Sequence, residues 1–224
     1  MRVRALCESC RVKWEYAELA VCPKCGREYS RCNCMPGILR GSGAAATLKL
    51  LPYDKYQDSV CRRLILFIKR KNEKRATDFL AGELMRPILQ YLSEAAIANE
   101  QVLVSFVPRG KNICLKLGFD QAENLADALA LRLGTLCLRL VGRRRFTGRE
   151  QKRLGENARF LNANGAFCLE EEDFETLNRE YRCILLVDDV ITTGATLTAC
   201  VKLLKEKFHG RIVCVTVART VNKG

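Results

Sequence analysis

Two adjacent carboxylates, Asp188 and Asp189, end an apolar run and precede a segment with the composition of a phosphate-binding loop. That loop and the helix start behind it comprise Thr192, Thr193, Gly194, Ala195 and Thr196. Free N–H groups at a helix start and threonine hydroxyls suit a phosphate group, and Gly194 lets the backbone approach an anion with no Cβ in the way. The carboxylates can accept hydrogen bonds from sugar hydroxyls. The run therefore predicts a ribose-phosphate site.

The competing interpretation of this run is an acidic turn followed by a threonine N-cap, because Asp and Thr are favoured at such positions. A P-loop is excluded, since no Gly-Lys-Ser/Thr follows.

Six cysteines near the N-terminus have the spacing of a metal site: Cys7, Cys10, Cys22, Cys25, Cys32 and Cys34. The first four form two Cys-x-x-Cys pairs, a gap that lets both thiolates of a pair reach one tetrahedral ion. We expect the two pairs to share one zinc ion, with the spacer between them forming a small hairpin. Four thiolates leave no open coordination position, so the predicted zinc is structural.

Cys32 and Cys34 are separated by one residue, which is a poorer chelating geometry. They can replace a ligand of the paired set, join a second site or stay free. For the paired cysteines the alternative is a buried or redox-active role. The chain has thirteen cysteines in all, and the other seven lie among apolar neighbours, where we expect them to fill the core.

A basic segment, residues 139–153, contains seven arginines or lysines and one glutamate. The residues expected to contact a ligand there are Arg143, Arg144, Arg145 and Arg149. Arginine guanidinium groups suit phosphate oxygens, so we expect this segment to contact pyrophosphate or the backbone of single-stranded DNA. A solvated basic loop is the alternative.

Strands alternate with helices along the chain that carries these residues. Strands are expected at 44–51, 102–107, 135–141, 183–187 and 211–217, and helices at 59–69, 78–92, 121–133 and 195–208. Pro87 is expected to kink or divide the second helix. Asp120 and Glu123 form a capping box for the third, and Gly134 ends it. The alternation predicts an α/β fold with a parallel sheet.

The composition limits the classes of protein to which the chain can belong. The chain has 224 residues, of which 48% are hydrophobic, and this excludes a disordered tail. A formal net charge of +13 favours a polyanionic ligand or partner. We expect no signal peptide and no membrane span, because no apolar run is long enough. A cytoplasmic location follows, where clustered cysteines bind metal more often than they form disulfides.

Residues 187–196 closely resemble the 5-phosphoribosyl-1-pyrophosphate (PRPP) signature of type I phosphoribosyltransferases. The flanking sequence resembles the ComF family of competence-associated, phosphoribosyltransferase-like proteins. Besides the cysteine pairs, the residues that carry this resemblance are Tyr53-Asp54, Lys69, Val107-Pro108, Gly118-Phe119-Asp120-Gln121, Thr147, Gln151, Leu154, Arg159, Asn162 and Ala166-Phe167. The chain departs from the family at Leu117, where an arginine is usual.

The resemblance implies a type I phosphoribosyltransferase-like parallel sheet flanked by helices at 43–224, with a zinc ribbon at 1–42. It implies that Asp188 and Asp189 hold ribose hydroxyls, that residues 192–196 hold the 5′-phosphate, and that Mg²⁺ binds with PRPP. It also implies a role in natural transformation, in the uptake and processing of single-stranded DNA together with uptake or recombination proteins.

Two other functions stay open. One is a general phosphoribosyltransferase of nucleotide metabolism with an unidentified acceptor. The other is a PRPP-sensing regulator, for which the sequence offers no helix-turn-helix. Whether the chain catalyses transfer or only binds PRPP is not decided by its residues.

Overall fold

A four-stranded parallel sheet in the order β1-β6-β5-β2 forms the centre of the protein. The structure is a computed structural model that describes residues 6–54, 59–144 and 165–220. The strands of the sheet are β1 (Ala46–Tyr53), β2 (Val102–Phe106), β5 (Cys183–Ile191) and β6 (Arg211–Thr220). A separate antiparallel pair consists of β3 (Val141–Arg143) and β4 (Phe167–Leu169). The predicted α/β class with a parallel sheet is confirmed.

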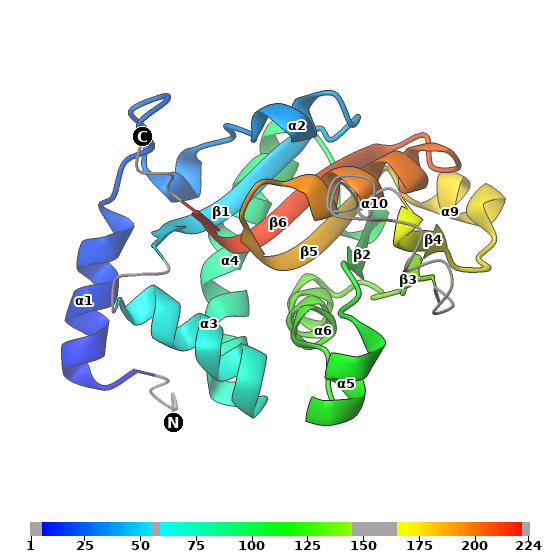
Figure 1. Cartoon of the computed structure of the whole chain (residues 1–224). Coiled ribbons are helices and arrows are strands. Elements are labelled where there is room, and N and C mark those ends of the chain that lie inside the picture. Colours follow the sequence, from blue (N-terminus) through cyan, green and yellow to red (C-terminus); the bar gives the residue numbers. More distant parts are fainter. Residues whose placement is uncertain (1–5, 55–58, 145–164, 221–224) are drawn as a thin grey trace.

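Helices cover both faces of the sheet (Figure 1). On one face lie α1 (Glu8–Glu18), α3 (Val60–Lys71), α4 (Lys74–Glu94) and α6 (Gln121–Leu133). On the other face lie α2 (Gly37–Arg40), α9 (Phe174–Glu180) and α10 (Ala195–Lys205). The short helix α5 (Lys111–Leu117) connects β2 to α6, and two 3-10 turns are η1 (Tyr29–Arg31) and η2 (Asn99–Gln101). This layering requires crossover connections between parallel strands.

Strand β5 shows why the core divides into two layers. Its side chains alternate between the faces: Cys183, Leu185 and Val187 join the cluster under α3, α4 and α6, whereas Ile184 and Leu186 join the cluster under α10. All five are fully buried. A strand buried on both faces needs a continuous apolar run, as the sequence has here.

The helix ends follow the chemistry of their terminal residues. Ser59 accepts the N–H of Arg62 at 3.2 Å and begins α3. Asp120 accepts the N–H of Ala122 at 3.0 Å and begins α6, and Gly134, with φ of 71°, ends it as predicted. Glu123 was expected to complete a capping box with Asp120. Its two carboxylate oxygens instead accept hydrogen bonds of 3.0 and 3.1 Å from Nη2 of Arg139.

Both prolines in regular elements lie inside them. Pro52 lies within β1, where the strand continues to Tyr53. Because β1 is an edge strand, a missing N–H is tolerated there. Pro87 lies inside the continuous 21-residue helix α4, so the predicted division does not occur. The strand expected at 135–141 is reduced to a bridge between Cys137 and Val104, with β3 beginning at Val141.

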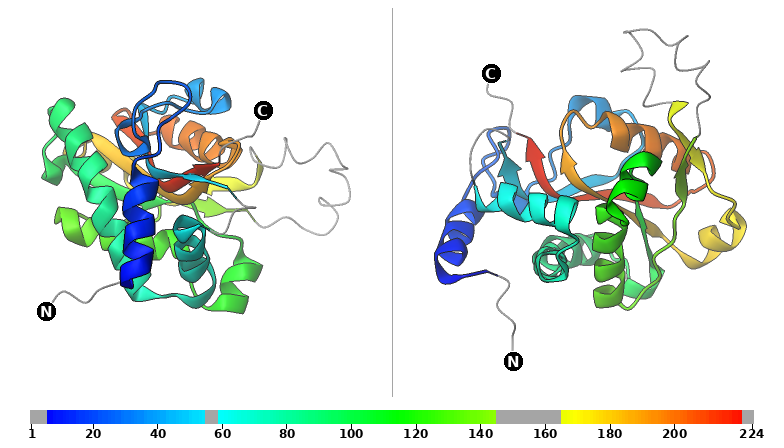
Figure 2. Two further views of the ribbon diagram at one scale, coloured as in Figure 1. Left: turned by 90° about the vertical axis from the view of Figure 1, so that its left-hand side faces the viewer. Right: turned by 60° about the horizontal axis from the view of Figure 1, so that its bottom comes forward.

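The spacer between the two cysteine pairs forms the helix α1 and not the hairpin that was expected. The two views of Figure 2 show α1 along the side of the molecule that carries β1. Trp14 of α1 is buried and meets the ring of Phe79 edge-on, with the ring centroids 4.9 Å apart. The N-terminal helix therefore contributes to the main core. The division into units 1–42 and 43–224 stays a prediction.

None of the helices in the described part of the chain is long and apolar enough to cross a membrane.

Candidate functional site

The carboxyl end of β5 brings together side chains from three elements. Asp189 is 5% exposed, and its Oδ2 lies 3.0 Å from Lys69 Nζ at the end of α3. The same oxygen accepts a hydrogen bond of 3.0 Å from Nε2 of Gln121, at the start of α6. A buried carboxylate is stable only when it is paired and hydrogen-bonded, and both partners satisfy this requirement.

The side chain of Gln121 has one polar atom without a partner. Its Nε2 donates to Asp189, but Oε1 is buried and has no hydrogen-bond partner in the structure. Buried polar atoms of this kind are rare, and at a functional site they mark a place for water or a ligand. The orphaned oxygen therefore points to a polar group that binds beside Asp189.

Asp188 has different surroundings from Asp189. It follows Val187 on the strand, so its side chain leaves on the α10 side of the sheet. Its Oδ1 accepts the N–H of Asp189 at 2.8 Å. Burial, together with the charge of Asp189, raises the pKa of Asp188 to about 8. The carboxyl can therefore exchange a proton near neutral pH, unlike an ordinary surface aspartate.

Two further residues connect the end of β2 to this cluster. The backbone N–H of Arg109 donates to Asp120 Oδ2 at 2.6 Å, and Asp120 is buried. The Nη1 of Arg109 donates to the carbonyl oxygen of Lys69 at 3.0 Å. These contacts hold α3 and the start of α6 at the same edge of the sheet. The sequence motifs did not mark Lys69, Arg109 or Gln121 as site residues, although Lys69 and Gln121 are among the residues that carry the family resemblance. The contacts of Lys69 and Gln121 with Asp189, and of Arg109 with Lys69, join residues 40 or more positions apart.

The loop after β5 has the conformation that its composition predicts. Gly194 has φ of 87° and is the N-cap of α10, so the N-cap residue has no side chain that could cap this helix. Thr192 and Thr193 are exposed, and Ala195 and Thr196 are partly buried at the first turn. The N–H of Ala195 donates to Thr193 Oγ1 at 3.3 Å. The structure therefore brings a carboxylate pair, exposed threonine hydroxyls and the start of α10 together at one edge of the sheet.

The chain that follows the cysteines covers this loop. A Cβ at Gly194 would lie 3.2 Å from Pro36 side-chain atoms and 3.4 Å from Ile38 Cγ2. Glycine is thus required both by the positive φ and by the close approach of this segment. Pro36 and Ile38 of the N-terminal region therefore pack against the loop after β5.

Four cysteines form a compact thiol cluster: Cys22, Cys25, Cys32 and Cys34. Their sulfur atoms all lie within 4.8 Å of one another, so the group could hold a metal ion. The first pair lies in a turn in which the N–H groups of Cys25 and Gly26 donate to the carbonyl of Cys22, and Gly26 has φ of 68°. The N–H of Cys34 donates to the sulfur of Cys32 at 3.4 Å. Tetrathiolate sites of this composition are closed and structural.

The structure corrects the predicted ligand set. Cys7 and Cys10 were expected to share an ion with Cys22 and Cys25, but the cluster contains Cys32 and Cys34 in their place. The physical reason is α1: Cys10 lies inside this helix, and the eight helical residues that follow it extend about 12 Å at 1.5 Å per residue before the chain reaches Cys22. The hairpin assumed for the spacer would have brought the pairs together, and a helix holds them apart.

Two basic side chains lie against the cysteine module, which we define as residues 20–36. Lys49 of β1 is fully buried and donates through Nζ to the carbonyl oxygens of Cys32 and, at 3.3 Å, Cys34. Arg219 of β6 donates to the same Cys34 oxygen at 3.1 Å. Burial, partly offset by the thiol of Cys32, lowers the pKa of Lys49. Thiolates bound to a divalent ion carry net negative charge, which these cations would balance.

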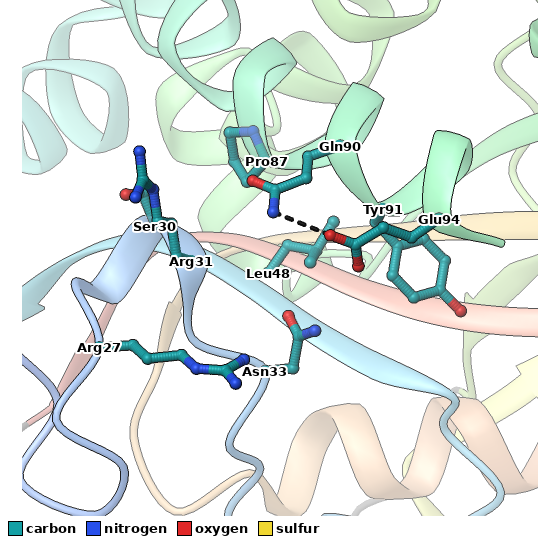
Figure 3. Close-up of a pocket in the computed structure, with 9 residues that line it drawn as sticks. All are labelled: Arg27, Ser30, Arg31, Asn33, Leu48, Pro87, Gln90, Tyr91 and Glu94. Atoms are coloured by element: carbon teal, nitrogen blue, oxygen red, sulfur yellow. Dashed lines mark hydrogen bonds between the residues drawn. The ribbon is translucent and has the colours of Figure 1, made fainter.

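A cleft of about 40 Å³ lies between the cysteine module and α4 (Figure 3). Arg27 and Asn33 line it from the module, and Gln90 and Glu94 line it from α4, where Gln90 donates to Glu94 at 2.9 Å. Leu48 of β1 also lines the cleft. A volume of this size admits water and no larger ligand. The cleft is therefore a packing junction between the module and α4.

The described part of the basic segment, residues 139–144, ends close to the carboxyl edge of the sheet. Arg143 at the end of β3 donates through Nε to the carbonyl oxygen of Pro108 at 2.9 Å, and its guanidinium lies 4.7 Å from the centre of the Phe167 ring. Arg144 is exposed and its N–H donates to the Ala166 carbonyl. The other predicted basic contacts, Arg145 and Arg149, lie outside the described residues, as do Thr147, Gln151, Leu154, Arg159 and Asn162.

Comparisons with known proteins add little to this geometry. No protein-family model matches the chain, and no curated protein matches it. A solved structure, the crystal structure of TT1426 from Thermus thermophilus, aligns with 69% of this chain and 86% of its own at 18% identity. Its TM-score of 0.34 is too low to support any argument about fold or function.

The raised pKa of Asp188 predicts a pH-dependent stability effect. Between its unfolded pKa of about 3.9 and its folded pKa, the native state binds the extra proton, so stability falls as pH rises. Asp188→Asn removes this penalty. We expect the variant to raise the thermal midpoint by about 3 °C or more at pH 8.5, and by less at pH 5.5, in scanning calorimetry.

Asp78→Asn is the matched control for this comparison, because Asp78 is an exposed carboxylate on α4. It should change the midpoint equally at both pH values. An Asp188→Asn gain that is the same at pH 5.5 and pH 8.5 would contradict the assigned pKa.

Proposed function

We propose that this chain binds PRPP at the carboxyl end of β5 and acts as a phosphoribosyltransferase-like protein of the ComF type. The observation that carries the proposal is the course of residues 187–196, in which a buried strand carries two carboxylates near its carboxyl end and a threonine loop leads to the start of a helix. In open α/β sheets, ligands bind outside the carboxyl ends of the strands.

The phosphate end of PRPP is assigned to the start of α10. The N-cap residue Gly194 has no side chain that could cap this helix, and the helix dipole favours an anion at its start. The hydroxyls of Thr192 and Thr193 are exposed beside it.

The ribose end is assigned to the carboxylates. Asp188 accepts one backbone N–H, and its remaining acceptor capacity suits a ribose hydroxyl. Asp189 is already held by Lys69 and Gln121, so we assign it mainly to positioning. The orphaned Oε1 of Gln121 is a second acceptor for a hydroxyl group.

Mg²⁺ is implied with PRPP, and the donor set fits it. Carboxylate oxygens are the protein ligands that Mg²⁺ uses together with substrate phosphates, and Asp188 supplies such a group at this edge. When bound, the ion would neutralise charge that develops on the departing pyrophosphate. Lys69 and Arg109 place further positive charge at the same edge.

Transfer of the phosphoribosyl group breaks the bond between C1 of the ribose and pyrophosphate. That chemistry, through an oxocarbenium-like transition state, depends on positioning and charge stabilisation more than on a side-chain nucleophile. We accordingly assign no catalytic base and no particular acceptor. A role in general nucleotide metabolism is the alternative to a role in DNA uptake.

We further propose that the thiol cluster holds one structural zinc ion. Thiolates favour zinc over harder divalent ions, and Lys49 and Arg219 lie where they balance the charge of the complex. Zinc would supply folding energy to a module whose own apolar cluster contains only a few residues, among them Tyr29.

A role in natural transformation is supported by the net charge of +13 and by the basic segment that leaves β3 beside the PRPP site. Single-stranded DNA is bound through its phosphates by such segments. We propose that Arg144 belongs to the DNA-binding surface, whereas Arg143 is held in place by Pro108 and Phe167.

PRPP binding is the first test of this function. In isothermal titration with Mg²⁺ present, we expect the wild-type chain to bind PRPP and Asp188→Asn to bind at least about tenfold more weakly, a loss of about 1.4 kcal/mol. Asp78→Asn should bind as the wild type does. A wild-type chain that shows no binding to PRPP at millimolar concentration would contradict the proposal.

Catalysis is measured separately, as pyrophosphate released from PRPP in the presence of a panel of nucleobases. Release that disappears in Asp188→Asn identifies an enzyme. Binding of PRPP with no release for any acceptor favours a binding protein of the uptake machinery.

Metal content tests the ligand set. We expect about one zinc ion per purified chain by elemental analysis, because four thiolates close one tetrahedral site. Cys32→Ser should lose most of the metal, since it removes one of the four ligands. Cys7→Ser is the matched control and should retain it. A loss of metal in Cys7→Ser with retention in Cys32→Ser would restore the ligand set predicted from spacing.

DNA binding tests the basic segment. In fluorescence anisotropy with a labelled oligothymidine, Arg144→Ala should weaken binding and reduce the slope of log affinity against log salt by about 0.7, the value for one lost phosphate contact. Arg179→Ala removes an exposed arginine from α9 and should leave both quantities unchanged. An unchanged slope in Arg144→Ala would exclude this residue from the DNA surface.

A further inference from the structure

Cys7 and Cys10 remain as a pair of thiols that the metal cluster does not use. In the described part of the chain, the group of metal-ligating side chains that the structure brings together is the four-cysteine cluster of residues 22–34. Cys7 and Cys10 lie at the opposite end of α1 from it. The two thiols can therefore have a role other than binding the metal ion of that cluster.

The pair lies at the start of a helix of eleven residues. Cys7 is the N-cap residue of α1 and is exposed, and Cys10 lies in the first turn and is partly buried. Residues three apart on a helix are neighbours, and both cysteines line the same cavity. Cys7 Sγ also lies 3.4 Å from the hydroxyl oxygen of Ser9. Such neighbours have Cβ atoms about 5–6 Å apart, against about 3.8 Å in a disulfide, so a bond between the two sulfurs requires the first turn of α1 to adjust.

A cavity of about 420 Å³ adjoins the pair, and both cysteines line it. Its apolar lining comes from α3 and the start of α4 and includes Leu64 and Phe67. Two exposed arginines, Arg63 and Arg75, and one exposed carboxylate, Glu73, also line it, so the charged lining is positive by one. The volume fits a small organic ligand. The combination of apolar walls, positive charge and an adjacent thiol suits a small molecule that carries carboxylates and sulfur.

We propose that Cys7 and Cys10 form a redox-active dithiol that exchanges with a low-molecular-weight disulfide bearing carboxylates, bound in this cavity. Cys7 is the attacking thiol because it is exposed, and Cys10 is the resolving thiol because it is partly buried behind it. The proposal is independent of PRPP binding, since the cavity residues differ from those at the end of β5.

The exchange balances in two steps. The Cys7 thiolate attacks one sulfur of the small disulfide, which forms a mixed disulfide and releases one thiolate. The Cys10 thiolate then attacks the Cys7 sulfur, which forms the Cys7–Cys10 disulfide and releases the second thiolate. Two protein thiols are oxidised, one disulfide is reduced to two thiols, and the two protons of the cysteines pass to the released thiolates.

The protonation of the two thiols agrees with these roles. Hydrogen bonds from the Ser9 hydroxyl, the Cys10 N–H and the Cys10 thiol lower the pKa of Cys7 to about 7. The interaction with Cys7, followed by burial, raises the pKa of Cys10. A thiol with a pKa near ambient pH is the better attacking group.

Peptide mapping of the full zinc-loaded chain after incubation with oxidised glutathione tests the proposal. The wild type should form a disulfide between Cys7 and Cys10. Cys10→Ser should accumulate glutathione on Cys7, because the resolving thiol is missing. Cys7→Ser should react at Cys10 at least about tenfold more slowly, and the partly buried Cys114 serves as an internal reference thiol.

The cavity has a test of its own. Arg75→Ala should slow the reaction with oxidised glutathione severalfold and leave the reaction with uncharged bis(2-hydroxyethyl) disulfide unchanged. Equal slowing with both reagents would overturn the assignment of the cavity to a carboxylate ligand.

Two results would overturn the dithiol itself. One is equal glutathione incorporation at Cys7 and Cys10 with no disulfide between them. The other is a fall in zinc content in both Cys7→Ser and Cys10→Ser, which would make the pair metal ligands. Neither result depends on PRPP binding, so failure of this inference and failure of the proposed function are separate outcomes.

Discussion

The buried carboxylate of Asp189 is the constraint on which the site depends. It lies at the end of the central strand β5 and is 5% exposed, so it must be neutralised by groups that reach it from other elements. Lys69 and Gln121 do so from α3 and α6. These contacts hold the end of α3 and the start of α6 at the edge of the sheet where β5 leads into its loop.

A second set of contacts ties the N-terminal cysteines to the same edge. Lys49 and Arg219 hold the backbone of the cysteine module against β1 and β6. The chain that leaves the module then passes over Gly194 through Pro36 and Ile38. The thiol cluster and the loop after β5 are therefore parts of one packed surface, and order in the module supports the position of the loop.

Local chemistry was enough to predict several elements. The apolar run before Asp188 predicted the central strand, and Asp120 and Gly134 predicted the ends of α6. These features depend on residues that are neighbours in sequence. Pro87 was expected to divide a helix, yet α4 continues through it. The apolar stripe of α4 packs over its whole length, and tertiary burial outweighs the local cost of one proline.

The full set of metal ligands could not be predicted from the spacing of the cysteines alone. Spacing paired Cys22 and Cys25 correctly, because a two-residue gap is a local property. It could not choose between Cys7 with Cys10 and Cys32 with Cys34 as their partners, because that choice depends on whether the spacer is a hairpin or a helix. Burial of Trp14 against Phe79 accompanies the helical form, and this contact joins residues far apart in the chain.

By itself, therefore, the sequence determined the α/β class, the carboxylate pair with its threonine loop, and the group of six cysteines near the N-terminus. Each of these follows from residue types at short spacing. Only the tertiary structure decided which four thiols meet, and that Lys69 and Gln121 share the Asp189 carboxylate. It also decided that Cys7 and Cys10 lie beside a cavity of their own. Those facts are distances between elements, which the packing of α1, α3 and α6 on the sheet sets.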